Sequence, residues 1–121
     1  NHDATNNYYA NLQVGESPTS GIPALLQGNA PLVLPAGFQT VTDAAGNTVS
    51  WMIERVCENG YVGDPLDPGI DRCDLLFPKV SPAGTTMEPA GLPVNPVPLY
   101  RVSIRVDGPA NTVTFAQAML R

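Results

Sequence analysis

The sequence has few charged residues, and basic residues are the scarcest. Charged side chains make up 14% of the 121 residues, against roughly one quarter in ordinary soluble domains. Lys79 is the single lysine, and the net charge is -5. Binding to nucleic acid requires clustered lysine and arginine, which this chain lacks. The composition therefore excludes nucleic acid as an expected partner.

Long apolar runs and a leader are also missing. No run approaches the roughly 18 apolar residues of a membrane-spanning helix, and the chain starts at Asn1 without a signal peptide. We expect Asn1 to be a processed or engineered start, with an N-terminal segment removed. Any contact with a membrane would then be made through an N-terminal helix that this sequence does not contain.

Motifs for catalysis are absent too. His2 is the only histidine, and we expect it to lie in a frayed terminus. The sequence has neither a nucleophile elbow nor a phosphate-binding loop. Glu54 and Glu58 have no evident apolar pocket that would raise a carboxyl pKa, so we expect them at the surface. The sequence predicts a protein that is not an enzyme.

The residues that are present indicate one β-dominated domain over residues 1–121. The 13 prolines and 11 glycines favour loops. Period-two alternation and turn residues predict two hairpins, each with strands on either side of a tight turn. The four predicted strands are 38–42, 48–57, 100–106 and 112–120. We therefore expect an α+β fold with a four-stranded antiparallel sheet and a short or truncated N-terminal helix within residues 1–12.

Strand 48–57 has apolar residues on both faces, which predicts a central position with a covering layer on each side. Within this chain, the N-terminal segment is the one candidate for such a layer. Trp51 and Phe115 are in step with apolar neighbours, which favours a place in the core. Arg101 and Arg105 fall on the face predicted to lie away from the core. There they would pair across strands, with Glu54 for example, or bind a carboxylate of a partner.

Cys57 and Cys73 are the only cysteines, and their spacing fits neither a zinc site nor a redox motif. The simplest interpretation is one disulfide, which implies an oxidising compartment; two buried free thiols are the alternative. The pair bounds a loop over residues 58–77. Residues 78–98 are rich in proline, so we expect a surface connector there.

Four aspartates lie within this loop, which makes it the sharpest candidate for a site. They are Asp64, Asp67, Asp71 and Asp74. Calcium binds clustered carboxylates and loop carbonyls, although the spacing is not that of an EF-hand. Asp before Pro is also ordinary turn chemistry, and Asp71 can pair with Arg72 locally. The sequence predicts no other cofactor.

Several segments carry a family resemblance. They are W-M-I-E-R-V-C at 51–57, the second cysteine at 73, and L-Y-R-V-S-I-R-V-D-G-P-A-N-T-V-T-F-A-Q-A-M-L at 99–120. Together with Tyr8 and Tyr9, in this order, they resemble the C-terminal region of PilX-type minor pilins, which belong to bacterial type IV pili. The hairpin at 99–120 is the most specific part, and the family's leader and membrane-spanning helix are not in this sequence.

The resemblance implies a pilin-like headgroup whose sheet packs on an N-terminal helix. It implies a role in priming pilus assembly or in a tip complex, through contacts with other minor pilins or the major pilin. The location would be extracellular or periplasmic, on the pilus of a Gram-negative bacterium, with adhesion as a further role. The alternative is a stand-alone extracellular binding or adhesion module that uses the acidic disulfide loop, with or without calcium.

Overall fold

The structure is a computed structural model that describes residues 2–67, 72–76 and 96–121. These residues form a five-stranded sheet and a separate two-stranded ladder. The described part of the chain contains no α-helix, only the short 3-10 turns η1 (Ala4–Asn6), η2 (Ala24–Leu26) and η3 (Pro109–Asn111). The architecture is β-dominated, as the sequence predicted.

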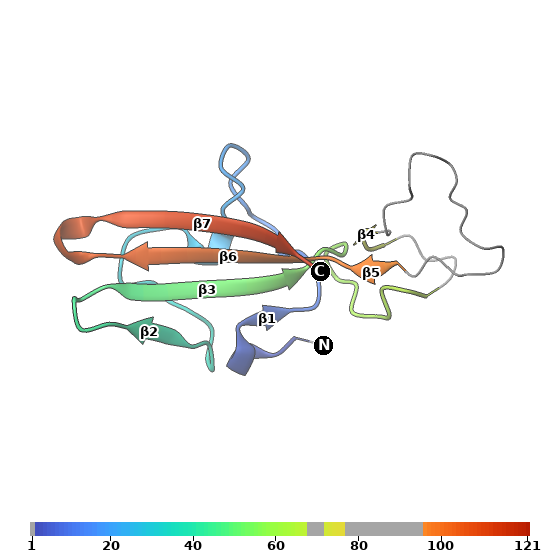
Figure 1. Cartoon of the computed structure of the whole chain (residues 1–121), viewed down its shortest axis with the longest axis horizontal. Helices are drawn as coiled ribbons and strands as arrows, with labels where there is room; N and C mark the ends of the chain where they lie inside the picture. Colours follow the sequence, from blue (N-terminus) through green and yellow to red (C-terminus); the bar gives the residue numbers. More distant parts are fainter. Residues whose placement is uncertain (1, 68–71, 77–95) are drawn as a thin grey trace, which may run out of the picture.

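The large sheet is built around one central strand (Figure 1). Its strands are β1 (Tyr8–Tyr9), β2 (Thr40–Thr42), β3 (Thr48–Arg55), β6 (Tyr100–Asp107) and β7 (Val113–Leu120). β3 pairs with β6 along its whole length on one edge. Its other edge is shared by β2, which is antiparallel, and β1, which is parallel. β7 follows β6 as the outermost strand on the far side.

Both predicted hairpins are present, β2–β3 and β6–β7. The prediction of a purely antiparallel four-stranded sheet is wrong, because β1 adds a fifth strand and makes the sheet mixed. The predicted N-terminal helix is also wrong. Asn7 adopts a left-handed backbone with φ of 54°, and its side chain bonds the backbone of Gln39 and Trp51. These contacts turn the chain into β1 after a single 3-10 turn.

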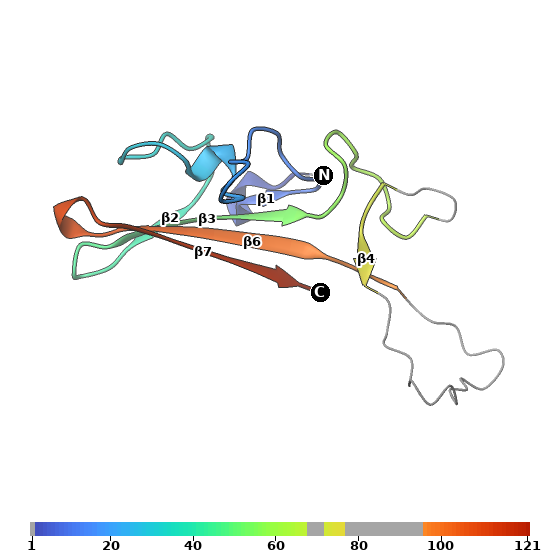
Figure 2. The same cartoon turned by 90° about the horizontal axis from the view of Figure 1, so that it is seen from above.

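One face of the sheet is covered by coil. Residues 10–39, which connect β1 to β2 and which we call the cover segment, lie on one side of the strands (Figure 2). Leu26 from this segment and Met52 from β3 are fully buried between the two layers. The core therefore lies between a sheet and an irregular layer that has little secondary structure of its own.

The small ladder lies beyond the end of β3 and pairs β4 (Leu75–Leu76) with β5 (Val97–Pro98). It joins the end of the predicted Cys-bounded loop to the end of the predicted connector. Pro98 is tolerated there because a two-stranded ladder leaves one edge of each strand free of partners. Residues 68–71 and 77–95, which hold most of the connector, lie outside the described residues.

Candidate functional site

One face of the large sheet is not covered by any described segment and carries mostly apolar side chains. Cross-strand register places Trp51 of β3 beside Ile104 of β6, which in turn lies beside Ala116 of β7. The same register aligns Val41 with Val49 and Val106, and aligns Ile53 with Val102 and Ala118. Directly opposed residues point to the same side of a sheet, so these side chains form one apolar surface. We call it the open face.

None of the apolar side chains on the open face is fully buried. Those along β3 and β6 are half-buried, while Val41 is 56% exposed and Leu120 is 52% exposed. Tyr8 and Tyr100 close one end of the surface, with ring centroids 6.4 Å apart. Arg55 falls in the same row, but its guanidinium turns away to the carbonyls of Ala10 and Gly63. The open face is therefore apolar and presents no free charge.

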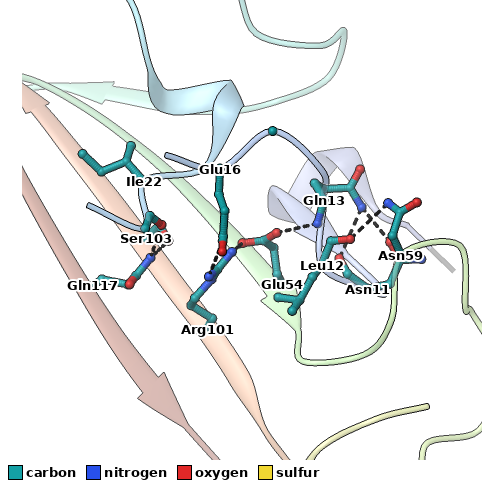
Figure 3. Close-up of polar contacts among 12 residues, drawn as sticks. Asn11, Leu12, Gln13, Glu16, Ile22, Glu54, Asn59, Arg101, Ser103 and Gln117 are labelled. Atoms are coloured by element: carbon teal, nitrogen blue, oxygen red, sulfur yellow. Dashed lines mark hydrogen bonds and ion pairs between the residues drawn. The ribbon is translucent and has the colours of Figure 1, made fainter. Parts of the chain in front are cut away.

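The opposite face, under the cover segment, is polar and buried. Glu54 is fully buried, and its Oε1 accepts hydrogen bonds from Arg101 Nε and Nη2 at 3.1 and 2.8 Å. Its Oε2 accepts a bond from the backbone N–H of Gln13 at 2.8 Å. Arg101 Nη1 also contacts Glu16 at 2.7 Å. Figure 3 shows how this network ties the cover segment to β3 and β6.

The network acts on the pKa of Arg101 in two directions. Burial would lower the pKa of the guanidinium, because it penalises the charged form. Hydrogen bonds and charges from Glu54 and Glu16 outweigh this effect and raise the pKa above its ordinary value. Arg101 is therefore a permanent cation that holds two carboxylates, one on the sheet and one on the cover segment.

A second buried arginine anchors the middle of the cover segment. Arg105 is 1% exposed and binds Asp107 at 2.8 Å. Its Nη1 donates to the carbonyl oxygens of Leu26 and Gly28 at 2.9 and 2.6 Å. Further along, Gln117 Nε2 donates to Ser103 Oγ at 2.9 Å and to the carbonyl of Gly21 at 3.1 Å. Polar side chains thus fix the cover segment at several points along its length.

This arrangement corrects several predictions about single residues. Glu54 was expected at the surface and is buried. Arg101 and Arg105 were expected away from the core and lie under the cover segment, where Arg105 is buried and Arg101 is half-buried. The predicted pairing of Arg101 with Glu54 is confirmed. Phe115 was predicted in the core but is 40% exposed, on the covered side of the sheet. Trp51 was also predicted in the core and is half-buried on the open face. The cover segment is coil, and its unpaired backbone groups need polar partners. It therefore packs on the sheet face that carries the polar side chains of the alternating strands.

The predicted disulfide is present, since Cys57 and Cys73 are bonded. It closes the Cys-bounded loop, in which Arg72 pairs with Glu58 at 2.9 Å. Two arginines approach the ring of Tyr61, with the guanidinium carbons of Arg55 and Arg72 at 6.0 and 5.2 Å from its centroid. Sequence reasoning missed this cluster, because arginine–tyrosine pairing has no fixed spacing along the chain.

The acidic residues of the loop follow turn chemistry where they are described. Asp64 Oδ1 accepts a bond from the backbone N–H of Leu66, and the carbonyl of Asp64 accepts one from Tyr61 Oη. Asp67 and Asp74 are exposed. Within the described residues no three potential metal ligands come together. Asp71, the fourth predicted ligand, lies outside them.

His2 is held in place, contrary to the expectation of a frayed end. Its Nδ1 accepts a hydrogen bond from the backbone N–H of Ala10 at 3.0 Å, and its ring packs edge-on against Tyr9 at 5.0 Å. Burial raises the pKa of the Tyr9 phenol, and the nearby charge of Glu54 adds to this effect. The histidine thus makes structural contacts with the start of the cover segment and with β1.

In the part of the chain that is described, no helix is long and apolar enough to cross a membrane. Comparison with protein families, with curated proteins and with solved structures gave no match for this chain.

Proposed function

We propose that this chain is the globular headgroup of a minor pilin, which contributes to type IV pilus assembly or to a tip complex through protein–protein contacts. The open face of the sheet is the observation that carries the proposal. A surface of this kind requires an apolar partner layer, because exposed apolar area on this scale is rare in isolated soluble domains. The pilin resemblance supplies that layer as an N-terminal helix.

The dimensions of the open face suit one helix. Strands of eight residues, such as β3, β6 and β7, span about 27 Å at 3.4 Å per residue. A helix of about 18 residues has the same length at 1.5 Å per residue, and its diameter of about 10 Å covers two to three strands. The absence of free charge on this face agrees with an apolar helix stripe as its partner.

The exposed side of the headgroup would then make contacts with other pilins. The Cys-bounded loop presents polar groups such as Glu58, Asp64 and Arg72 at the end of the sheet. Loops on a rigid scaffold are the usual place for variable recognition surfaces. The disulfide is compatible with an oxidising, extracellular or periplasmic compartment. In this proposal function arises from surface complementarity and not from bond chemistry.

The first test is the coding sequence immediately upstream of the codon for Asn1. We expect a short basic leader followed by about 20 apolar residues. An ordinary cleavable signal peptide, or no such segment, would overturn the membrane-anchored pilin. The alternative extracellular binding module would then be preferred, and calcium titration of the acidic loop would be the next experiment.

A second test uses the full-length protein in its host. Ile104→Asp places a charge on the open face, and we expect it to abolish pilus assembly supported by this subunit. Val33→Asp is the matched control, because Val33 is 95% exposed and lies on the cover segment, on the other side of the sheet. Equal piliation with both variants would show that the open face is not a packing surface.

A further inference from the structure

The outer edge of β7 forms one long side of the large sheet. β7 pairs with β6 at every one of its eight positions, from Val113 to Leu120. Among the described residues no strand pairs with its other edge. All eight residues are exposed, including Val113, Phe115, Met119 and Leu120, at 44, 40, 54 and 52%.

The hairpin fixes which backbone groups point outward. The N–H of Gly108 donates to the carbonyl of Thr112 at 2.8 Å, which sets the start of the alternation. In an antiparallel ladder every second pair exchanges hydrogen bonds, so the even-numbered residues of β7 bond β6. The odd-numbered residues therefore direct their N–H and C=O groups away from the sheet. They are Val113, Phe115, Gln117 and Met119.

This edge lacks the devices that usually protect an exposed strand. Val113–Leu120 contains no charged residue, no proline and no bulge in its register with β6. The opposite edge of the sheet is blunted, because β1 has two residues and β2 has three. The contrast between the two edges indicates that the β7 edge is kept open for pairing.

We propose that β7 pairs antiparallel with β7 of a second copy of this chain, so that two sheets join into one. A two-fold axis perpendicular to the sheet brings the outward groups of both strands into register, with Ala116 or Gln117 at its centre. The same operation sets open face beside open face and covered face beside covered face. With Gln117 at the centre, the exposed Phe115 of each copy lies opposite Met119 of the other.

The lack of charge on β7 suits a second copy as the occupant. Two-fold pairing sets β7 against the same segment of the other copy, so any charged side chain on this strand would lie close to a like charge, and Val113–Leu120 carries none. The net charge of -5 on each chain opposes association elsewhere. β7 is uncharged, whereas β3 carries Glu54 and Arg55, and β6 carries Arg101, Arg105 and Asp107. An edge made of eight residues is well below the roughly 20 to 30 residues a side of a standard interface. The dimer therefore belongs to the weak, transient class.

The experiment is sedimentation velocity of the chain over a range of concentrations up to about 1 mM, the region of weak dimerisation. We expect the wild-type sedimentation coefficient to rise with concentration. Met119→Pro removes one outward N–H without removing a bond to β6, and we expect it to weaken association at least about tenfold, or 1.4 kcal/mol. Met119→Ala keeps that N–H and is the matched control for the lost side chain, expected to associate nearly as the wild type does.

Val41→Lys tests association through the open face instead. We expect it to leave dimerisation unchanged, since Val41 lies at the far edge of the sheet on β2. Amide hydrogen exchange gives an independent readout, in which Phe115, Gln117 and Met119 gain protection as the concentration rises. A monomer at all concentrations would overturn the inference. So would association that survives Met119→Pro and is lost in Val41→Lys, or irregular aggregation without a discrete dimer.

This inference stands apart from the pilin proposal, because the edge of β7 is available whatever covers the open face. A missing upstream helix would remove the pilin proposal and leave the β7 pair intact. A monomer with an open β7 edge would remove the pair and leave the pilin proposal intact.

Discussion

Replacing Glu54 with alanine tests whether the buried ion pair holds the cover segment on the sheet. The change removes a fully buried carboxylate that accepts two hydrogen bonds from Arg101 and one from Gln13. Breaking a buried pair by removing one partner costs about 3–5 kcal/mol, because the other charge is left uncompensated. Arg101 keeps Glu16 at 2.7 Å, so we expect a loss of about 3 kcal/mol, at the low end of that range.

The control is Glu58→Ala. Glu58 also pairs with an arginine at 2.9 Å, but its side chain is 59% exposed and that of Arg72 is 48% exposed. Exposed pairs contribute about 1 kcal/mol or less, since water screens them and the long side chains lose freedom on pairing. The two variants remove the same functional group, so the difference between them isolates the effect of burial.

The assay is urea unfolding with the disulfide intact, followed by the fluorescence of Trp51, the single tryptophan. The free energy of unfolding comes from linear extrapolation, and an unchanged slope shows that the variants unfold over the same surface. A cycle with Arg101→Ala separates the pair from other losses. If Glu54→Ala lost no more stability than Glu58→Ala, the reasoning that the buried network anchors the cover segment would be wrong.

Three further outcomes are expected. Arg105→Met leaves the Asp107 carboxylate without its cation and two carbonyls without donors, so it should lower the free energy of unfolding by about 3 kcal/mol or more in the same urea assay; a loss below about 1 kcal/mol would contradict this. The double variant Cys57→Ala/Cys73→Ala removes a 16-residue closure and should lose about 3 kcal/mol, measured as a fall in Tm that reduction of the wild type reproduces. Burial raises the pKa of Tyr8 and of Tyr9 above the ordinary 10.0, so the folded state holds these protons more tightly and stability should decline as the pH rises above 10; normal ionisation of all tyrosines in an absorbance titration of the folded protein would refute it.

The strands were predictable from the sequence because each one depends on local information. Alternation along Thr48–Arg55 and Tyr100–Asp107, with turn residues at 43–47 and 107–111, is sufficient to place both hairpins. The parallel strand β1 was not predictable. It has two residues, and its pairing depends on Asn7, whose side chain bonds backbone groups more than 30 positions away.

The sequence-based prediction of which sheet face is buried was wrong, and the reason is physical. Apolar alternation normally identifies the buried face, and it placed Trp51 correctly in one row with Ile104. The cover segment is coil, however, with free carbonyls and amides that need polar partners. It therefore buries the polar face of the sheet, where Glu54 and Arg105 bond its backbone groups, and leaves the apolar face open. The complementary charges of Glu54 and Arg101 at opposed positions were the available signal, and that pairing was predicted.

The shared edge of β3 also determines the order in which the chain can fold. The β2–β3 turn closes over a few residues, and the β6–β7 turn does the same, so both hairpins form early. β1 pairs with β3 across 45 positions, and it can do so only after β3 has a defined edge. Two amides report the two stages, since Asp43 N–H donates to Asn47 in the β2–β3 turn and Ile53 N–H donates to Asn7 at the end of η1. In pulsed hydrogen exchange Asp43 should become protected before Ile53, which makes β1 a late addition to a hairpin that is already formed.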